Sequence, residues 1–234
     1  MAKRVFIAGA SRGLGLFLTQ KYLEEGHTVY AGLRDVNAKG IVALKAKFGD
    51  KITPVTLDMI DTASVNRAAK AVGEHTDTLD VIINNAGIHG DSSFEPLETT
   101  NLDDCTAVYD LNAVGPLRVV KAFLPFISGD TFSNVINIST ESASIGDCQR
   151  HKEFDYCMSK AALNMGVKLL QNYLRDRNVK VTAIQPGWMR TDMGGPDAHL
   201  DPYENACKLY GLFESFACTD GTLFVDNDGK ELPW

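Results

Sequence analysis

One stretch decides the fold: Gly9-Ala10-Ser11-Arg12-Gly13-Leu14-Gly15. It directly follows the apolar run Val5–Ala8 and opens into a helical pattern that ends near Gly26 and has one apolar face, made by Leu14, Phe17, Leu18 and Tyr22. Glycines permit a tight turn and a close approach of the backbone to a ligand, and a helix N-terminus offers unpaired N–H groups to phosphate. The alternative is a glycine-rich turn that only joins a strand to a helix, but its place at the first strand–helix junction favours nucleotide binding.

Short β-branched runs alternate with helical patterns along the rest of the chain, which is typical of βαβ units that build a parallel sheet. The expected strands are Val5–Ala8, Thr28–Leu33, Ile52–Leu57, Val81–Asn84, Val135–Ile138, Val179–Ile184 and Thr222–Val225. Pro54 predicts that the third strand begins irregularly or is shorter than its apolar run. We therefore predict one α/β domain over residues 1–234: a single-domain Rossmann fold with a doubly wound, seven-stranded parallel sheet and helices on both faces.

The composition is that of a globular protein with one sizeable core. Of the 234 residues, 44% are hydrophobic and 23% are charged, and the formal net charge of −7 argues against nucleic acid or an anionic membrane as a partner. The five cysteines form no C-x-x-C pair, so neither a disulfide framework nor a metal site is expected. The sequence has no signal-like or membrane-spanning apolar run, and we expect a cytoplasmic protein.

Two further motifs accompany the glycine turn: Asn84-Asn85-Ala86-Gly87 after the fourth expected strand, and Tyr156-x-x-x-Lys160 later in the chain. Together with the G-x-x-x-G-x-G spacing, they resemble the short-chain dehydrogenase/reductase family over nearly the whole chain. The segments Asn137-Ile138-Ser139 and Gly229–Trp234 are similar to members of the carbonyl-reductase and C-factor type. The resemblance implies a nicotinamide dinucleotide cofactor, a small carbonyl or alcohol substrate, and frequent homo-oligomers.

The end of the second expected strand indicates which dinucleotide binds. NAD enzymes of this fold usually carry an acidic residue there, whereas this sequence has Leu33 and Arg34. Arg34 and Arg12 are suited to a 2′-phosphate, which predicts NADP(H); local pairing of Arg34 with Asp35 is the alternative. The cofactor-binding residues implied by the resemblance are Gly9, Ser11, Arg12, Gly13, Leu14, Gly15, Arg34, Asp58, Met59, Asn85, Ala86, Gly87, Tyr156, Lys160, Pro186, Gly187 and Thr191.

Tyr156 and Lys160 are the reacting pair that the resemblance implies. They lie four residues apart on a predicted helix and so share one face, although a surface pair without chemistry is the alternative. A nearby ammonium and a positive nicotinamide would lower the pKa of the phenol toward a range useful for proton exchange. Tyr156 is then the acid in reduction and the base in oxidation.

Asn112 lies inside a long expected helix from about Leu102 to Phe126. Pro116 has no N–H and cannot donate to the carbonyl of Asn112, so that acceptor is released. In the resembled family the asparagine at this point holds a water that leads to the catalytic lysine. A simple proline kink is the alternative.

In the resembled family, the hydroxyl that polarises the substrate carbonyl follows the fifth strand, and here Ser139–Ser144 offers four hydroxyls. The register after the strand favours Thr140. Tyr156 follows Thr140 by 16 residues and Ser142 by 14, and the family spacing is commonly shorter than either, so Ser142 is the runner-up. Ser139 and Ser144 are expected to be structural.

The segment Pro186–Thr191 resembles the part of the family that closes over the nicotinamide, where Thr191 would bind the carboxamide; a Pro-Gly turn is the alternative. We expect a short substrate loop around 188–215, with Asp192–Pro202 as a mobile loop or lid. The candidates for an apolar substrate pocket are Trp188, Met189, Met193, Tyr203, His151 and Phe154.

These features predict an NADP(H)-dependent oxidoreductase that reduces a ketone or aldehyde. Thr140 or Ser142 would polarise the carbonyl, Tyr156 would deliver a proton, and Lys160 would orient the ribose. Two alternatives stay open: an NAD(H)-dependent alcohol dehydrogenase, and a dinucleotide-binding sensor with little turnover. The unusual hydroxyl region favours the sensor, and the intact set of Asn112, Tyr156 and Lys160 argues against it.

Overall fold

One parallel sheet organises the protein in this computed structural model, which describes residues 1–127, 129–217 and 224–234. Its order is β3-β2-β1-β4-β5-β6-β7, which confirms the predicted single Rossmann domain with a doubly wound sheet. The strands are β1 (Arg4–Ala8), β2 (Thr28–Leu33), β3 (Ile52–Thr56), β4 (Val81–Asn84), β5 (Ser133–Ile138), β6 (Val179–Ile184) and β7 (Phe224–Val225). Residues 222 and 223 of the seventh expected strand lie outside the described residues.

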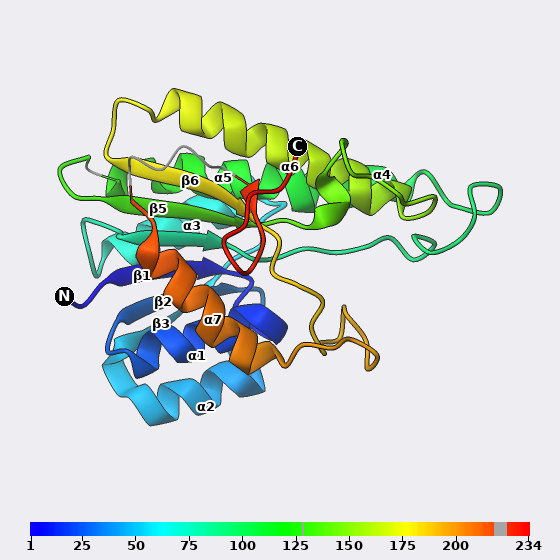
Figure 1. Cartoon of the computed structure of the whole chain (residues 1–234). Helices are drawn as coiled ribbons and strands as arrows, with labels where there is room; N and C mark the ends of the chain where they lie inside the picture. Colours follow the sequence, from blue (N-terminus) through cyan, green and yellow to red (C-terminus); the bar gives the residue numbers. More distant parts are fainter. Residues whose placement is uncertain (128, 218–223) are drawn as a thin grey trace.

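Helices cover both faces of this sheet (Figure 1). One layer contains α1 (Gly13–Glu24), α2 (Lys39–Phe48) and α7 (Pro202–Ser215). The other contains α3 (Thr62–Gly73), α5 (Gly115–Phe123) and α6 (Phe154–Tyr173), with α4 (Asp104–Tyr109) packed against α6. Within the described ranges, no helix has the length and apolar character needed to cross a membrane.

The alternation of side chains along β1 builds both cores at once. Val5 and Ile7 pack with α1, α2 and α7, whereas Phe6 and Ala8 pack with α3, α5 and α6. All four are fully buried, and the Phe6 ring lies 4.1 Å from that of Phe123 on α5. Burying each of the larger side chains stabilises the fold by about 1.5–3 kcal/mol, so β1 fixes the sheet between its two helical layers.

The backbone conformation bears on two predictions, the end of the first helix near Gly26 and the effect of Pro54 on the third strand. Helix α1 ends at Glu24, and Gly26 takes a φ of 83°, as expected for a glycine that closes a helix. Pro54, however, sits inside a regular β3 opposite Ala31, so the predicted irregular start is wrong, whereas the alternative of a shorter strand agrees with β3 ending at Thr56 rather than Leu57. The reason is that β3 is the edge strand, where a proline leaves no sheet partner unsatisfied.

The expected helix from Leu102 to Phe126 is helical from Asp104 but changes type along its length. A π-helical segment, η2 (Asp110–Val114), separates α4 from α5, and a 3-10 turn, η3 (Leu124–Phe126), ends the run. Asn112 is at the centre of η2, and Pro116 lies in the first turn of α5. The predicted irregularity at Asn112 is therefore confirmed.

Candidate functional site

A large cavity lies where the winding of the sheet reverses. Because β1 and β4 are neighbours, the connections that follow them leave toward opposite faces and open a crevice at the carboxyl ends of the strands. A cavity of about 1050 Å³ occupies this edge, from which the long loops of Figure 1 extend. All the predicted cofactor and catalytic residues line it except Gly15 and Asn112, which lie behind its wall.

The glycine turn brings α1 close to the ends of β1 and β4. Gly9 and Gly13 take φ values of 86° and 53°, and a Cβ on Gly15 would lie 2.1 Å from the Gly9 carbonyl oxygen. Asn85 donates from Nδ2 to that same oxygen at 3.0 Å. No side chain caps the first turn of α1, so its N–H groups face the cavity without a side-chain acceptor. These features fit a dinucleotide pyrophosphate.

The two arginines proposed for the 2′-phosphate have different surroundings. The guanidinium of Arg34 has no carboxylate within 4.0 Å among the residues the structure describes. Asp35 instead accepts the main-chain N–H of Asn37 at 2.9 Å, so the expected alternative of an Arg34–Asp35 pair is not formed. Arg12 lies 2.6 Å from the Asp192 carboxylate, and both side chains are exposed. Only Arg34 therefore reaches an incoming phosphate without first breaking an ion pair.

Residues expected at the adenine and nicotinamide ends also line the cavity. Asp58 accepts the N–H of Ile60 at its Oδ1, and Met59 is buried against Gly115. At the other end, the Thr191 hydroxyl accepts the N–H of Gly194 at 3.2 Å. Their roles toward a cofactor stay predictions.

Lys160 is fully enclosed at the centre of the site. Its Nζ donates to the carbonyl of Ile138 at 2.8 Å, and burial lowers its pKa to about 8. A Cβ on Gly87 would lie 3.3 Å from this Nζ and 3.5 Å from the Oδ1 of Asn112. The absence of a side chain at Gly87 thus lets the end of β4 lie against the lysine.

The side chain of Asn112 ties the segment after β4 to α6. Its Oδ1 accepts the Ile88 N–H at 2.9 Å, and its Nδ2 donates to the Ile88 carbonyl and to the Ser159 hydroxyl. The π-helical turn therefore aligns three elements around Lys160. The water-holding role of its main-chain oxygen stays a prediction.

Tyr156 stands beside Lys160 and is stacked on an imidazole. The ring centroids of Tyr156 and His89 are 4.4 Å apart with an interplanar angle of 14°, and the Nζ of Lys160 is 5.8 Å from the Tyr156 ring. Desolvation, followed by the charges of Glu141 and Glu153, raises the pKa of Tyr156 well above its ordinary range. The expected lowering by Lys160 is thus outweighed in the cofactor-free protein, and the phenol is protonated at neutral pH.

Thr140 and Ser142, the two candidates for the hydroxyl that polarises the substrate carbonyl, lie next to each other in the structure. Thr140 precedes a 3-10 turn, η4 (Glu141–Ala143), and accepts the Ser142 N–H at its Oγ1. The two hydroxyl oxygens are 3.3 Å apart, and both residues are buried at the cavity wall. Ser139 and Ser144 instead make internal bonds, to Asn164 and from the Asp147 N–H, as expected of structural residues.

The predicted substrate pocket is partly wrong. Trp188, Met189 and Met193 line the cavity, but Tyr203, His151 and Phe154 do not. Tyr203 belongs to α7, where it donates to Glu24 on α1 at 2.7 Å. The proposed substrate loop is also only in part a loop, because residues 202–215 form α7, which packs on α1.

The polar residues of the cavity wall that were not predicted as site residues include His89, Glu141, Arg150, Glu153 and Gln185. His89 directly follows the Asn-Asn-Ala-Gly motif and one isoleucine, and Gln185 directly precedes the Pro-Gly pair. Arg150 and Glu153 fall in the lengthened segment before Tyr156. Their adjacency to recognised motifs was the available signal.

Asp155 holds the loop that carries His89. Its carboxylate accepts the Gly90 N–H at 2.5 Å and the Ser93 hydroxyl at 2.6 Å. Burial opposes its ionisation, but these hydrogen bonds outweigh burial and hold the pKa of Asp155 below its usual range. The first turn of α6 thus fixes the imidazole over Tyr156.

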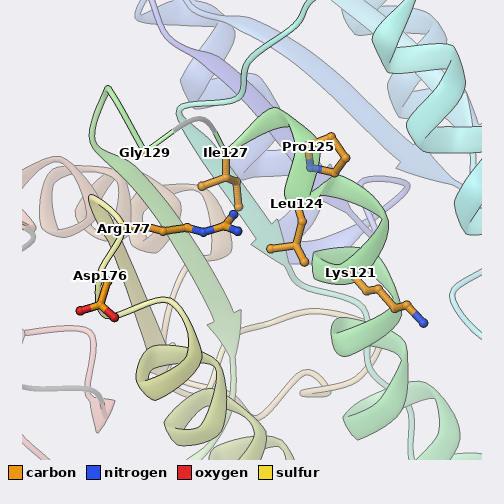
Figure 2. A pocket seen from close by; sticks show the side chains of 7 residues that line it. All are labelled: Lys121, Leu124, Pro125, Ile127, Gly129, Asp176 and Arg177. Carbon is orange, nitrogen blue, oxygen red and sulfur yellow. The ribbon is translucent and has the colours of Figure 1, made fainter.

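A second hollow, of about 800 Å³, lies near the start of β5 and β6, away from the carboxyl edge (Figure 2). It is lined by Lys121, Leu124, Pro125, Ile127, Gly129, Asp176 and Arg177. In Figure 2 the side chain of Lys121 points away from Asp176 and Arg177. The charged groups there do not converge, so the carboxyl-edge cavity is the candidate active site.

Comparison with known proteins agrees with this geometry. The family described as short chain dehydrogenase matches residues 3–199. C-signal from Myxococcus xanthus is 33% identical over 159 residues, covering 68% of this chain and 95% of that protein. The fission yeast Schizosaccharomyces pombe has an oxidoreductase, C663.09c, that is 35% identical over 192 residues, 82% of this chain and 75% of that protein.

Solved structures show the same architecture. The NADPH-bound carbonyl reductase from chicken fatty liver superposes with a TM-score of 0.90 at 30% identity, covering 100% of this chain and 99% of that one. An NADP complex of a carbonyl reductase from Pseudomonas aeruginosa gives a TM-score of 0.87 at 30% identity, with both chains fully covered. The chain belongs to the short chain dehydrogenase family. It is an oxidoreductase of this family with a site for a nicotinamide dinucleotide.

We predict that Gly15→Ala weakens dinucleotide binding by about ten-fold or more, because the added methyl group would collide with the Gly9 carbonyl and displace the turn. The measurement is a fluorescence titration with NADPH. The matched control is Gly211→Ala in α7, where a Cβ meets nothing within 4 Å. It should leave binding unchanged and raise the free energy of unfolding by about 0.5–1 kcal/mol. Equal binding by both variants would contradict the role of the turn.

Proposed function

We propose that the protein is an NADP(H)-dependent carbonyl reductase that reduces a ketone or aldehyde with Tyr156 as the general acid. The observation that carries the proposal is the convergence of Tyr156, Lys160 and the hydroxyl pair Thr140–Ser142 on the wall of one cavity that also contains the glycine turn. An acid, a cation and a hydroxyl donor around one open space are what carbonyl reduction needs.

The dinucleotide would be held along the cavity by residues of this chain. The first turn of α1 and the glycine turn would bind the pyrophosphate. Asn85–Gly87 would contact the ribose that Lys160 orients. The segment Pro186–Thr191 would bind the carboxamide. When bound, the reduced nicotinamide supplies a hydride.

Tyr156 carries the proton that carbonyl reduction requires. Its pKa is raised by desolvation and by Glu141 and Glu153, so the phenol carries its proton when substrate arrives. Lys160 lies 5.8 Å from the ring and would stabilise the phenolate that forms when the proton leaves.

The hydroxyl pair would bind the carbonyl oxygen of the substrate. We assign this contact to Thr140, with Ser142 as its neighbour, because the residue directly after β5 is held most firmly by the sheet. The two hydroxyls lie 3.3 Å apart, so Ser142 can donate its proton to Thr140 while Thr140 donates its own proton to the carbonyl oxygen of the substrate. The Thr140 hydroxyl lies 3.2 Å from the Glu141 carboxylate, and it would turn its proton from that carboxylate to the substrate oxygen, where a donor stabilises the developing charge.

NADP(H) is favoured over NAD(H) by the end of β2. Arg34 is exposed there, and it has no carboxylate partner within 4.0 Å among the described residues. It stands where NAD enzymes of this fold usually carry an acidic residue. Structural relatives described as carbonyl reductases were solved with NADPH or NADP. A cytoplasmic location and a homo-oligomer stay predictions from the sequence and its family.

The test of the proposed function is the loss of one oxygen. Tyr156→Phe should abolish turnover of carbonyl substrates with NADPH while leaving cofactor binding near the wild-type value, because the ring still stacks on His89. Steady-state assays over a panel of ketones, aldehydes, quinones and imines, with an NADPH titration alongside, make the measurement. Substantial reduction by the variant would show that another group is the acid, and a wild-type protein that binds NADPH without turnover would favour a sensor.

Cofactor preference gives a second prediction. Arg34→Ala should weaken NADPH binding by about ten-fold or more and leave NADH binding nearly unchanged, because a charged hydrogen bond to the 2′-phosphate contributes roughly 1.5–3 kcal/mol. Arg12→Ala should have a smaller effect, since Arg12 must first leave Asp192. Dissociation constants for both cofactors measure this. Equal wild-type affinities for NADPH and NADH would contradict the predicted preference for NADPH.

A further inference from the structure

A charged cluster borders the substrate end of the cavity: Glu141, Arg150 and Glu153. Arg150 donates from one nitrogen to Glu141 at 2.9 Å and from another to Glu153. Glu153 is buried and has a φ of 61°, the one positive φ of a non-glycine residue in the described part of the chain. Two carboxylates thus share one guanidinium, and the cluster has an excess negative charge.

We propose that Glu141 is a specificity-determining residue that selects substrates by charge. It disfavours carbonyl compounds that carry a carboxylate beside the reacting carbon and admits neutral and cationic ones. The inference rests on the proposed carbonyl reduction, and it names the class of substrate that this site accepts.

The position of Glu141 places its charge next to the reacting oxygen. Its Oε2 lies 3.2 Å from the Thr140 hydroxyl, which is at the same wall as Tyr156. A carbonyl oxygen bound to either hydroxyl of the pair, at about 2.8 Å, would lie within about 6 Å to 9 Å of this carboxylate. The nearer end of this range is shorter than the Debye length at physiological salt, so a carboxylate on the ligand would be repelled by Glu141.

Glu141 is also held in this position. Besides Arg150 and Thr140, it accepts a hydrogen bond from the Gln185 amide at the end of β6. Its side chain is still 52% exposed, so it faces solvent and the cavity rather than the core. A fixed, accessible carboxylate beside the reacting atoms discriminates between ligand charges.

Arg150 is not available to bind a substrate carboxylate. If it turned toward a ligand, the Glu153 carboxylate, whose side chain is only 9% exposed, would be left buried without its cation. Leaving a buried charge unpaired is strongly unfavourable. Arg150 therefore stays with Glu153, and its second nitrogen is occupied by Glu141.

Among the other titratable groups at this end, Lys160 is a cation, and it lies beside Tyr156, 5.8 Å from the ring. Lys160 is fully buried and bound to the Ile138 carbonyl. His89 is held neutral, since burial lowers its pKa. Farther along the wall, Asp103 and Asp110 are acidic, and Asp110 is paired with Arg118 at 2.7 Å.

The experiment uses three ketones that differ in the charge next to the carbonyl: benzoylformate, the neutral benzoylformamide and the permanently cationic phenacyltrimethylammonium. For each, kcat/KM with NADPH is compared between the wild type and Glu141→Gln, so that differences in intrinsic reactivity cancel. Glutamine keeps the size and the acceptor oxygen. Relative to the amide, the variant should gain about ten-fold on the anion and lose about ten-fold on the cation, the scale of one nearby unit charge.

The matched control is Glu98→Gln, which removes the same charge from an exposed residue that does not line the cavity. It should change all three values equally. A Glu141→Gln variant that also changes them by one common factor would overturn the inference while leaving carbonyl reduction intact. A wild-type protein that reduces neither these ketones nor any other carbonyl compound would overturn the proposed function itself, and the inference with it.

Equilibrium binding gives a readout that needs no turnover. Trp188 lines the cavity, so tryptophan fluorescence can follow the binding of benzoylformate and benzoylformamide to each protein. The ratio of the two dissociation constants should shift about ten-fold toward the anion in Glu141→Gln. An unchanged ratio would show that Glu141 does not sense ligand charge.

Discussion

The adjacency of β1 and β4 is the constraint on which the site depends. It sends the following connections to opposite faces of the sheet and leaves the crevice between them open. The glycine turn lies close against the segment that follows β4. A Cβ on Gly9 would lie 2.7 Å from the Ala86 nitrogen, and a Cβ on Gly15 would collide with Gly9 itself. Glycine at these positions lets the first turn of α1 and the end of β4 share one wall of the cavity.

The reacting groups are then aligned by buried polar contacts rather than by apolar packing. Asn112 joins Ile88 to Ser159, Lys160 is fixed to the Ile138 carbonyl, and Asp155 binds the loop that holds His89 over Tyr156. Together these bonds link α6, the π-helical turn and the ends of β4 and β5 to one another. Because a buried donor or acceptor is costly to leave unpaired, the network fixes one arrangement of the acid, the cation and the hydroxyl pair.

Sequence reasoning found what depends on local chemistry and missed what depends on tertiary contact. The glycine turn, the Tyr156–Lys160 spacing and the break at Asn112 follow from backbone geometry and could be predicted. Pro54 was misjudged because its tolerance depends on β3 being the edge strand. Tyr203 was misplaced because α7 turns it toward α1, and the paired charges around Arg150 come from loop residues whose spatial meeting no periodicity encodes.

The central claim, that this cavity transfers a hydride from a reduced nicotinamide to a carbonyl carbon, is tested most directly by isotope transfer. NADPH carrying deuterium at one or the other face of the nicotinamide C4 is incubated with a neutral ketone and the wild-type protein, and the alcohol is analysed by mass spectrometry. Since a site fixed by Lys160 and Pro186–Thr191 holds one ring face toward the substrate, one label should appear at the carbinol carbon and the other should be retained. Alcohol that is unlabelled with both cofactors, or no alcohol despite NADPH binding, would contradict the account.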